Sequence, residues 1–97
     1  MRKTDKKIDN QLRKSLIEIC EMALDTIVGY RWISHTVNYD VFPGSLRIVC
    51  TFASQQALDN LKRSKQDLVL NKMITQKLVE VGIPLKKSEQ QISYTVE

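Results

Sequence analysis

The sequence is poor in the residues that most often build metal and cofactor sites. Its 97 residues include one histidine, two cysteines, three glycines and two prolines. A zinc site needs three or four closely spaced ligands, and His35 with the distant Cys20 and Cys50 does not meet that pattern. Phosphate-binding loops need clustered glycines, whereas these glycines stand far apart. We therefore expect neither a metal nor a small-molecule cofactor.

A thiol–imidazole pair is the one catalytic arrangement that these residues allow. Cys50 and His35 lie in neighbouring alternating stretches, so a hairpin can bring a nucleophile near a base. However, Cys50 shares its strand face with Ile48 and Phe52, and no orienting group is evident. We interpret Cys50 and Cys20 as reduced, buried thiols and expect no catalytic residue and no enzyme. A disulfide would require the first helix to lay Cys20 directly over Cys50.

Long hydrophobic runs are also missing. No stretch approaches the roughly 18 uninterrupted apolar residues that a membrane helix needs. The first seven residues are highly charged and do not resemble a secretory signal. We expect a cytoplasmic protein without a membrane partner. The 42% hydrophobic and 27% charged content suits one folded domain, 1–97, whose basic end 1–7 is free to fray.

The hydrophobic repeat changes its period along the chain and indicates the first half of the fold. Apolar residues recur at three- and four-residue steps and predict a helix over roughly 5–28. Thr4-Asp5 caps its start, and Gly29 ends it. Alternation then runs through 30–41 and again through 46–52. These two stretches surround Pro43-Gly44, a turn dipeptide, and predict a hairpin.

The second half of the chain returns to helical spacing before a last strand. Ser54 is placed to cap a short helix. Ser64 and Asp67 have the spacing of a reciprocal cap, which predicts that a longer helix begins there and runs to Val81. Alternation through 92–96 predicts the final strand.

These elements follow the order α-β-β-α-α-β and predict a two-layer α+β domain, with a three-stranded sheet packed on helices. The last strand can pair with the first, which makes the sheet antiparallel, or with the second, which makes it mixed. The residues leave both pairings open.

The exposed face of the sheet is a candidate interaction surface. If the helices cover the opposite face, Tyr30, Trp32 and Val49 form an exposed patch suited to a protein partner or a homodimer. A shift of one residue reverses the strand, which would place Trp32 in the core and turn His35 toward water. The sequence allows both orientations.

Positive charge gathers in two stretches of the chain, whose formal net charge is +4. Residues 1–14 hold six basic side chains against two acidic ones, and residues 54–87 hold seven against three. A basic surface attracts a polyanion, so nucleic acid is a candidate partner, although clustered lysines more often form simply a solvated face. The residues predicted to contact phosphates are Arg2, Lys3, Lys6, Lys7, Lys62, Arg63 and Lys65.

The order of elements resembles that of the second type of KH domain, an RNA- and DNA-binding fold, and that of BolA-like proteins. This resemblance is one of topology along nearly the whole chain, and it implies a nucleic-acid partner. KH domains clamp the strand with Gly-x-x-Gly between the paired helices. The corresponding Lys62-Arg63-Ser64-Lys65 contains no glycine, and its side chains obstruct a close approach of the backbone.

Two further comparisons concern regulation. Thr4-Asp5-Lys6-Lys7 and the stretch from Asn38-Tyr39-Asp40 to Pro43 resemble small bacterial proteins of uncharacterised function that are loosely labelled Fis-type regulators. Helices at 54–62 and 65–81 also have lengths suited to a helix-turn-helix. Much of the circumference of the second helix is apolar. We interpret its outward residues as a polar solvent face, and they are Asp67, Asn71, Lys72, Thr75 and Gln76.

Overall fold

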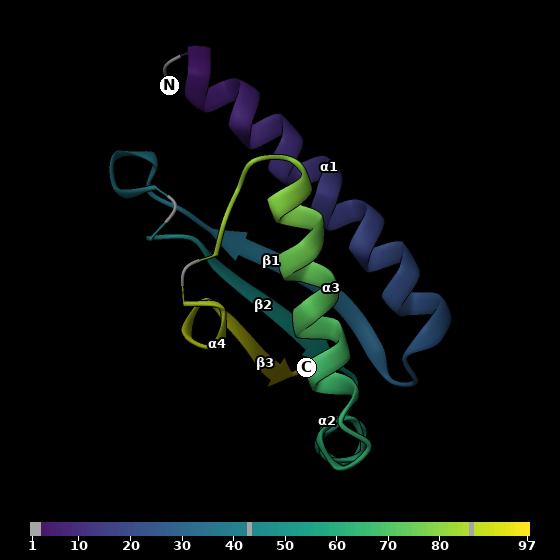
Figure 1. Ribbon diagram of the computed structural model, residues 1–97. Coiled ribbons are helices and arrows are strands. Elements are labelled where there is room, and N and C mark those ends of the chain that lie inside the picture. Colours follow the sequence, from purple (N-terminus) through teal and green to yellow (C-terminus); the bar gives the residue numbers. More distant parts are fainter. Residues whose placement is uncertain (1–2, 43, 86) are drawn as a thin grey trace.

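The computed structural model describes residues 3–42, 44–85 and 87–97, and its elements run in the predicted order α-β-β-α-α-β (Figure 1). The helices are α1 (Lys3–Thr26), α2 (Gln55–Arg63), α3 (Gln66–Glu80) and the short α4 (Ser88–Gln91), and the strands are β1 (Tyr30–Thr36), β2 (Arg47–Phe52) and β3 (Ile92–Val96). The predicted α+β class is confirmed. The single turn of helix in α4 was not predicted.

The sheet is mixed, with the strand order β1-β2-β3. β1 runs antiparallel to β2, with Ile33 opposite Cys50. β3 runs parallel to β2, with Ile92 opposite Ile48. Because α2 and α3 carry the chain back to the starting end of β2, the last strand joins in the same direction as β2. Of the two pairings that the sequence allows, the structure has the mixed one.

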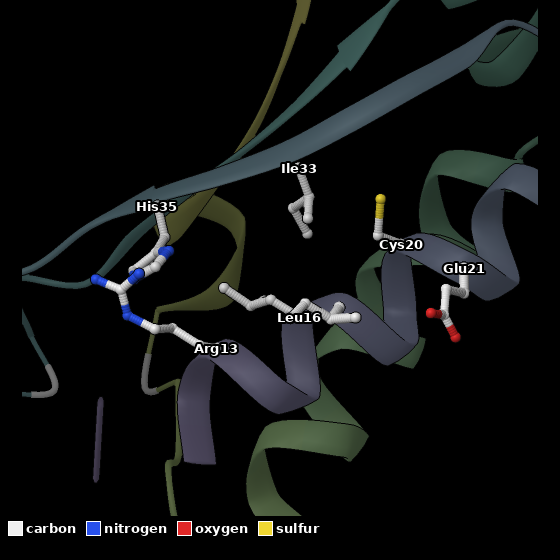
Figure 2. Close-up of a pocket in the computed structure, with 7 residues that line it drawn as sticks. Arg13, Leu16, Cys20, Glu21, Ile33 and His35 are labelled. Carbon is white, nitrogen blue, oxygen red and sulfur yellow. The ribbon is translucent and has the colours of Figure 1, made fainter. Parts of the chain in front are cut away.

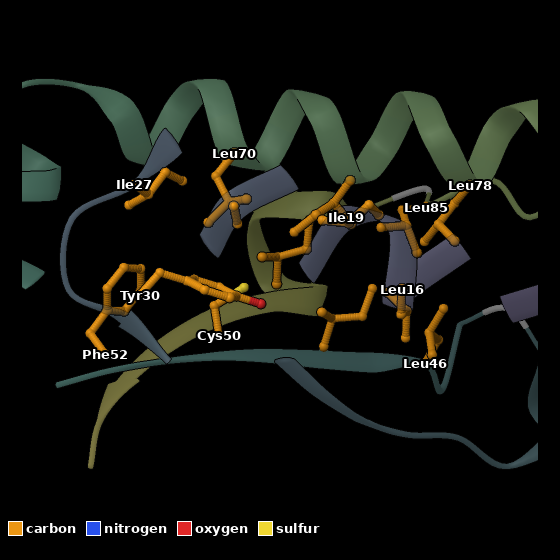
Figure 3. Close-up of a cluster of buried hydrophobic side chains, with 14 of the residues drawn as sticks. Leu16, Ile19, Ile27, Tyr30, Leu46, Cys50, Phe52, Leu70, Leu78 and Leu85 are labelled. Carbon is orange, nitrogen blue, oxygen red and sulfur yellow. The ribbon is translucent and has the colours of Figure 1, made fainter. Parts of the chain in front are cut away.

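One hydrophobic core lies between the sheet and the helices. Figures 1 and 3 show α1 and α3 on the same side of the sheet, with the buried side chains between these layers. The helices contribute apolar residues at three- and four-residue steps, and the strands contribute alternate residues. The fully or nearly fully buried members include Leu12, Leu16, Ile19 and Ala23 from α1, Leu70, Ile74 and Leu78 from α3, and Ile48, Cys50, Phe52 and Ile92 from the sheet.

The helix boundaries follow local chemistry. α1 begins at Lys3, one residue before the predicted cap at Thr4. The turn after α1 holds Gly29 at φ 84°, where a Cβ atom would lie 2.4 Å from the Cβ of Ala57 in α2. Only glycine combines this left-handed backbone with such close packing. The Ser54 hydroxyl accepts the amide of Ala57 at 3.1 Å, so its predicted capping role is confirmed.

The connection between β1 and β2 is longer than a two-residue turn. It contains a 3-10 turn, η1 (Tyr39–Val41), where the Asn38 side chain accepts the amide of Asp40 at 3.0 Å. The predicted turn residue Pro43 lies outside the described residues. The antiparallel pairing of β1 with β2 nevertheless confirms the predicted hairpin.

Candidate functional site

Three of the predicted phosphate-binding residues meet where α2 ends and α3 begins. Lys62, Arg63 and Lys65 are all exposed, and we call these three residues the basic corner. The predicted reciprocal cap at Ser64 is wrong. The Ser64 hydroxyl instead donates to the Leu61 carbonyl at 3.1 Å, and the Ser64 amide donates to the Asn60 carbonyl, so this residue closes α2.

Lys65 adopts an unusual backbone conformation at this corner. Its φ of 64° and ψ of 19° are left-handed, and among the described residues it is the one non-glycine residue with positive φ. A side chain in this conformation costs about 1 kcal/mol relative to glycine. Such strain concentrates at functional positions. The lysine thus occupies a position where glycine is the less strained residue.

Apolar side chains flank the basic corner on the first turn of α3. Leu68 and Val69 are each 63% exposed, and Lys72 is exposed one turn further along. Leu70 and Ile74 are buried, which fixes the rotation of α3 and leaves this mixed surface outward.

The start of α3 is also tied to the sheet. The Tyr94 hydroxyl of β3 donates to the Asp67 carbonyl at 3.0 Å, and the Leu68 amide donates to the Lys65 carbonyl at 3.2 Å. Leu58 and Leu61 are buried and anchor α2 beside it. These contacts hold the basic corner in a defined place.

The N-terminal basic residues lie at the other end of the molecule. Lys6 and Lys7 are exposed on the first turns of α1, whereas the turn that follows α1 packs against α2, the helix that leads into the basic corner (Figure 1). Midway, Glu18 of α1 pairs with Lys77 of α3 at 2.5 Å. The molecule is 42 Å long, so the two basic segments do not form one patch. Lys3 begins α1, and Arg2 lies outside the described residues.

The open face of the sheet exposes Trp32 but not Tyr30. Trp32 is 45% exposed and Val49 is half-buried. Both alternate with Ile33 and Cys50, which face the helices, so they lie on the opposite face of the sheet. Tyr30 is buried and its ring packs edge-on against Phe52, with 5.8 Å between ring centroids. A β-bulge between Tyr30 and Trp32 breaks the alternation and turns Tyr30 inward. Including Tyr30 in an exposed patch was therefore wrong.

The two thiols are free, and their surroundings are those of core residues. Cys50 is completely buried, and burial raises its pKa to about 12. Cys20 is half-buried in α1. The thiol of Cys50 is therefore protonated at neutral pH and is a poor nucleophile. Within the described ranges, no three His, Cys, Asp or Glu side chains gather closely enough to hold a metal ion.

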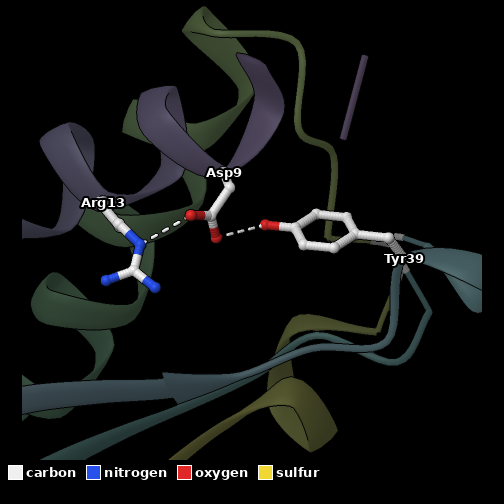
Figure 4. Close-up of polar contacts among 3 residues, drawn as sticks. All are labelled: Asp9, Arg13 and Tyr39. Atoms are coloured by element: carbon white, nitrogen blue, oxygen red, sulfur yellow. Dashed lines mark hydrogen bonds and ion pairs between the residues drawn. The ribbon is translucent and has the colours of Figure 1, made fainter. Parts of the chain in front are cut away.

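Sequence reasoning missed a polar cluster that joins α1 to the β1–β2 connection (Figure 4). Asp9 accepts hydrogen bonds from Tyr39 Oη and from Arg13 Nε, each at 2.7 Å. Both hydrogen bonds lower the pKa of Asp9, and the bond from Tyr39 has the larger effect. His35 lies nearby. Its pKa is lowered mainly by desolvation on burial and, to a smaller extent, by the positive charge of Arg13. No local motif could reveal this cluster, because Tyr39 lies 30 residues from Asp9.

Comparison of the chain with protein-family models, curated proteins and solved structures finds no match. In the part of the chain that the structure describes, no helix has the length and apolar character needed to cross a membrane. What the chain binds is therefore inferred from the chemistry of its own surface.

Proposed function

We propose that the chain is a non-enzymatic nucleic-acid-binding module whose basic corner contacts the phosphate backbone. The observation that carries the proposal is the gathering of Lys62, Arg63 and Lys65, all exposed, at the bend between α2 and α3. Lysine and arginine side chains are the usual partners of phosphate oxygens. The amides that open α3 add partial positive charge beside them.

Phosphate contact at this corner passes through side chains rather than through a glycine clamp. The left-handed Lys65 lets the chain turn without glycine and carries its ammonium group at the bend. The exposed Leu68 and Val69 lie next to the cations and offer apolar contact to unstacked bases. Unstacked bases are available in single strands, so a single-stranded nucleic acid suits this surface better than a duplex.

A pair of charge-matched triple variants tests the proposal. K62Q/R63Q/K65Q removes the basic corner, and K6Q/K7Q/K14Q removes the same charge from the first half of α1. We expect the corner variant to bind a fluorescent single-stranded oligonucleotide at least about tenfold more weakly at low salt, and the control to change by less than about threefold. Equal losses in both variants, or loss in the control alone, would overturn the assignment.

The exposure of Trp32 supports a second candidate function, a protein-interaction module acting through the open face of the sheet. A large aromatic side chain that is 45% exposed is a frequent anchor of protein interfaces. On this account, Trp32 emission shifts to shorter wavelength when a protein partner or a second copy covers it, and oligonucleotide leaves it unchanged. A spectrum that is constant at every protein concentration and in the presence of candidate partner proteins counts against it.

A further inference from the structure

A groove runs between α1 and β1 on the side of α1 that faces away from α3 (Figure 2). Its volume is about 340 Å³, with Arg13 at one end and Glu21 at the other. Between these charges the lining is apolar. It is formed by Leu16, Ile17, Cys20 and Ile33, and His35 lines the groove beside Arg13. Ile17 is 58% exposed, and the exposed Leu24 and Val28 continue the apolar stripe along α1.

The groove borders an unprotected sheet edge. β1 is an edge strand, and no described strand pairs with its outer side. Every second residue of such a strand directs its N–H and C=O groups outward, where another strand can bind them. Natural edges are usually protected by lysine, proline or a bulge. The segment from Trp32 to Thr36 contains none of these, because the bulge lies before it.

The charges along the groove are self-complementary. Arg13, Ile17 and Glu21 follow one another at four-residue spacing and therefore lie along one side of α1. A two-fold axis passing by Ile17 brings Arg13 of each copy to Glu21 of the other and sets the two Ile17 side chains together. Such reciprocity is what a symmetric dimer interface requires.

We infer that this face binds a second copy of the chain. In the dimer, β1 pairs antiparallel with the same strand of the second copy, and the two α1 helices pack side by side above the joined sheets. The pairing satisfies the outward backbone groups of both edges and covers Ile17 and Cys20. This dimer does not depend on the basic corner or on nucleic-acid binding.

Charge reversal with mixing tests the dimer directly. In a dimer of the Arg13→Glu variant, the new glutamate of each copy faces Glu21 of the other copy. In a dimer of the Glu21→Arg variant, the new arginine of each copy faces Arg13 of the other copy. We expect each variant alone to dimerise at least about tenfold more weakly than the wild type in sedimentation equilibrium. An equimolar mixture restores both attractive contacts, so native mass spectrometry should show the heterodimer in preference to either homodimer.

A control variant on the same helix separates the interface from general charge effects. Lys14→Glu reverses an exposed charge that lies on the Glu18 and Lys77 side of α1, away from the groove, and should leave dimerisation unchanged. Ile17→Lys should abolish the dimer while leaving the pairing of Arg13 with Asp9 intact. A wild-type protein that is monomeric up to high micromolar concentration would overturn the inference. A dimer that survives both reversals, or a mixture without heterodimer, would do the same.

Discussion

The hydroxyl of Tyr39 donates a 2.7 Å hydrogen bond to Oδ1 of Asp9 and so attaches the β1–β2 connection to α1. The other carboxylate oxygen accepts from Arg13. Asp9 is largely covered, with 13% of its side chain exposed, so water competes weakly for these bonds. The cluster therefore joins two parts of the fold that are distant in sequence.

Removal of this hydroxyl should weaken the fold without disturbing its packing. Tyr39→Phe keeps the ring that packs on Phe42 and removes only the donor to the carboxylate. Because a hydrogen bond to a charged group contributes more than a neutral one, we expect a loss of about 1–2 kcal/mol in unfolding free energy. Urea denaturation measures this loss. A double-mutant cycle with Asp9→Asn should show coupling between the two residues, and additive effects would contradict the contact.

Stability should fall as the pH drops through the range in which His35 ionises. Burial, assisted by the charge of Arg13 and opposed by that of Asp9, lowers the His35 pKa from 6.5 in the folded protein. Below pH 6.5 the unfolded chain therefore takes up a proton that the folded chain resists, and protonation favours unfolding. The pKa of Asp9 is lowered from 3.8, so its carboxylate stabilises the fold above pH 3.8 and loses this effect only in stronger acid.

Unfolding free energies measured from about pH 7.5 to about pH 5 can isolate the histidine. The wild type should lose stability across the lower part of this interval, and His35→Gln should lose less. If the unfolding free energies of the two proteins change with pH in the same way, the pKa of His35 is the same in the folded and unfolded chains, which would contradict this prediction.

The left-handed backbone at Lys65 predicts that glycine is preferred there for stability. Lys65→Gly and Lys65→Ala remove the same charge, but only glycine relieves the strain at φ 64°. We expect the glycine variant to be about 1 kcal/mol more stable than the alanine variant in chemical denaturation. Equal stability would mean that the solution backbone is not left-handed at this residue.

Two glycines with similar backbone angles should respond differently to a methyl group. Gly29→Ala combines a φ of 84° with a Cβ only 2.4 Å from that of Ala57, whereas Gly82→Ala has a φ of 80° and no atom within 4 Å. We expect a loss of about 1 kcal/mol at Gly82 and about 2–4 kcal/mol at Gly29, measured by thermal unfolding. Similar losses would contradict the close packing of α2 on this turn.

Periodicity was sufficient to predict most of the fold, because each long element buries one side. The helical steps of α1 and the alternation of β1, β2 and β3 all follow from contact with one core. The position of β3 beside β2 could not be predicted, since either neighbour offers the same backbone groups. The inward turn of Tyr30 depends on a bulge, and the bulge leaves no mark on the alternation of its neighbours.

The candidate site was predictable only where it is local in sequence. Lys62, Arg63 and Lys65 are close in the chain and remain close in the structure. Their separation from Lys6 and Lys7 is set by the direction in which α1 crosses the sheet, which charge counting does not reveal. The α1–β1 groove likewise exists only once α1 is placed over an edge strand.

The salt dependence of oligonucleotide binding tests the role of the basic corner most directly. Three phosphate contacts on a single strand predict that log K falls with log salt at a slope of about −2. Replacing Lys62, Arg63 or Lys65 by glutamine should each reduce the magnitude of this slope by about 0.7, since each variant releases one counterion contact fewer. A slope that the three substitutions leave unchanged, or no binding even at low salt, would contradict the assignment.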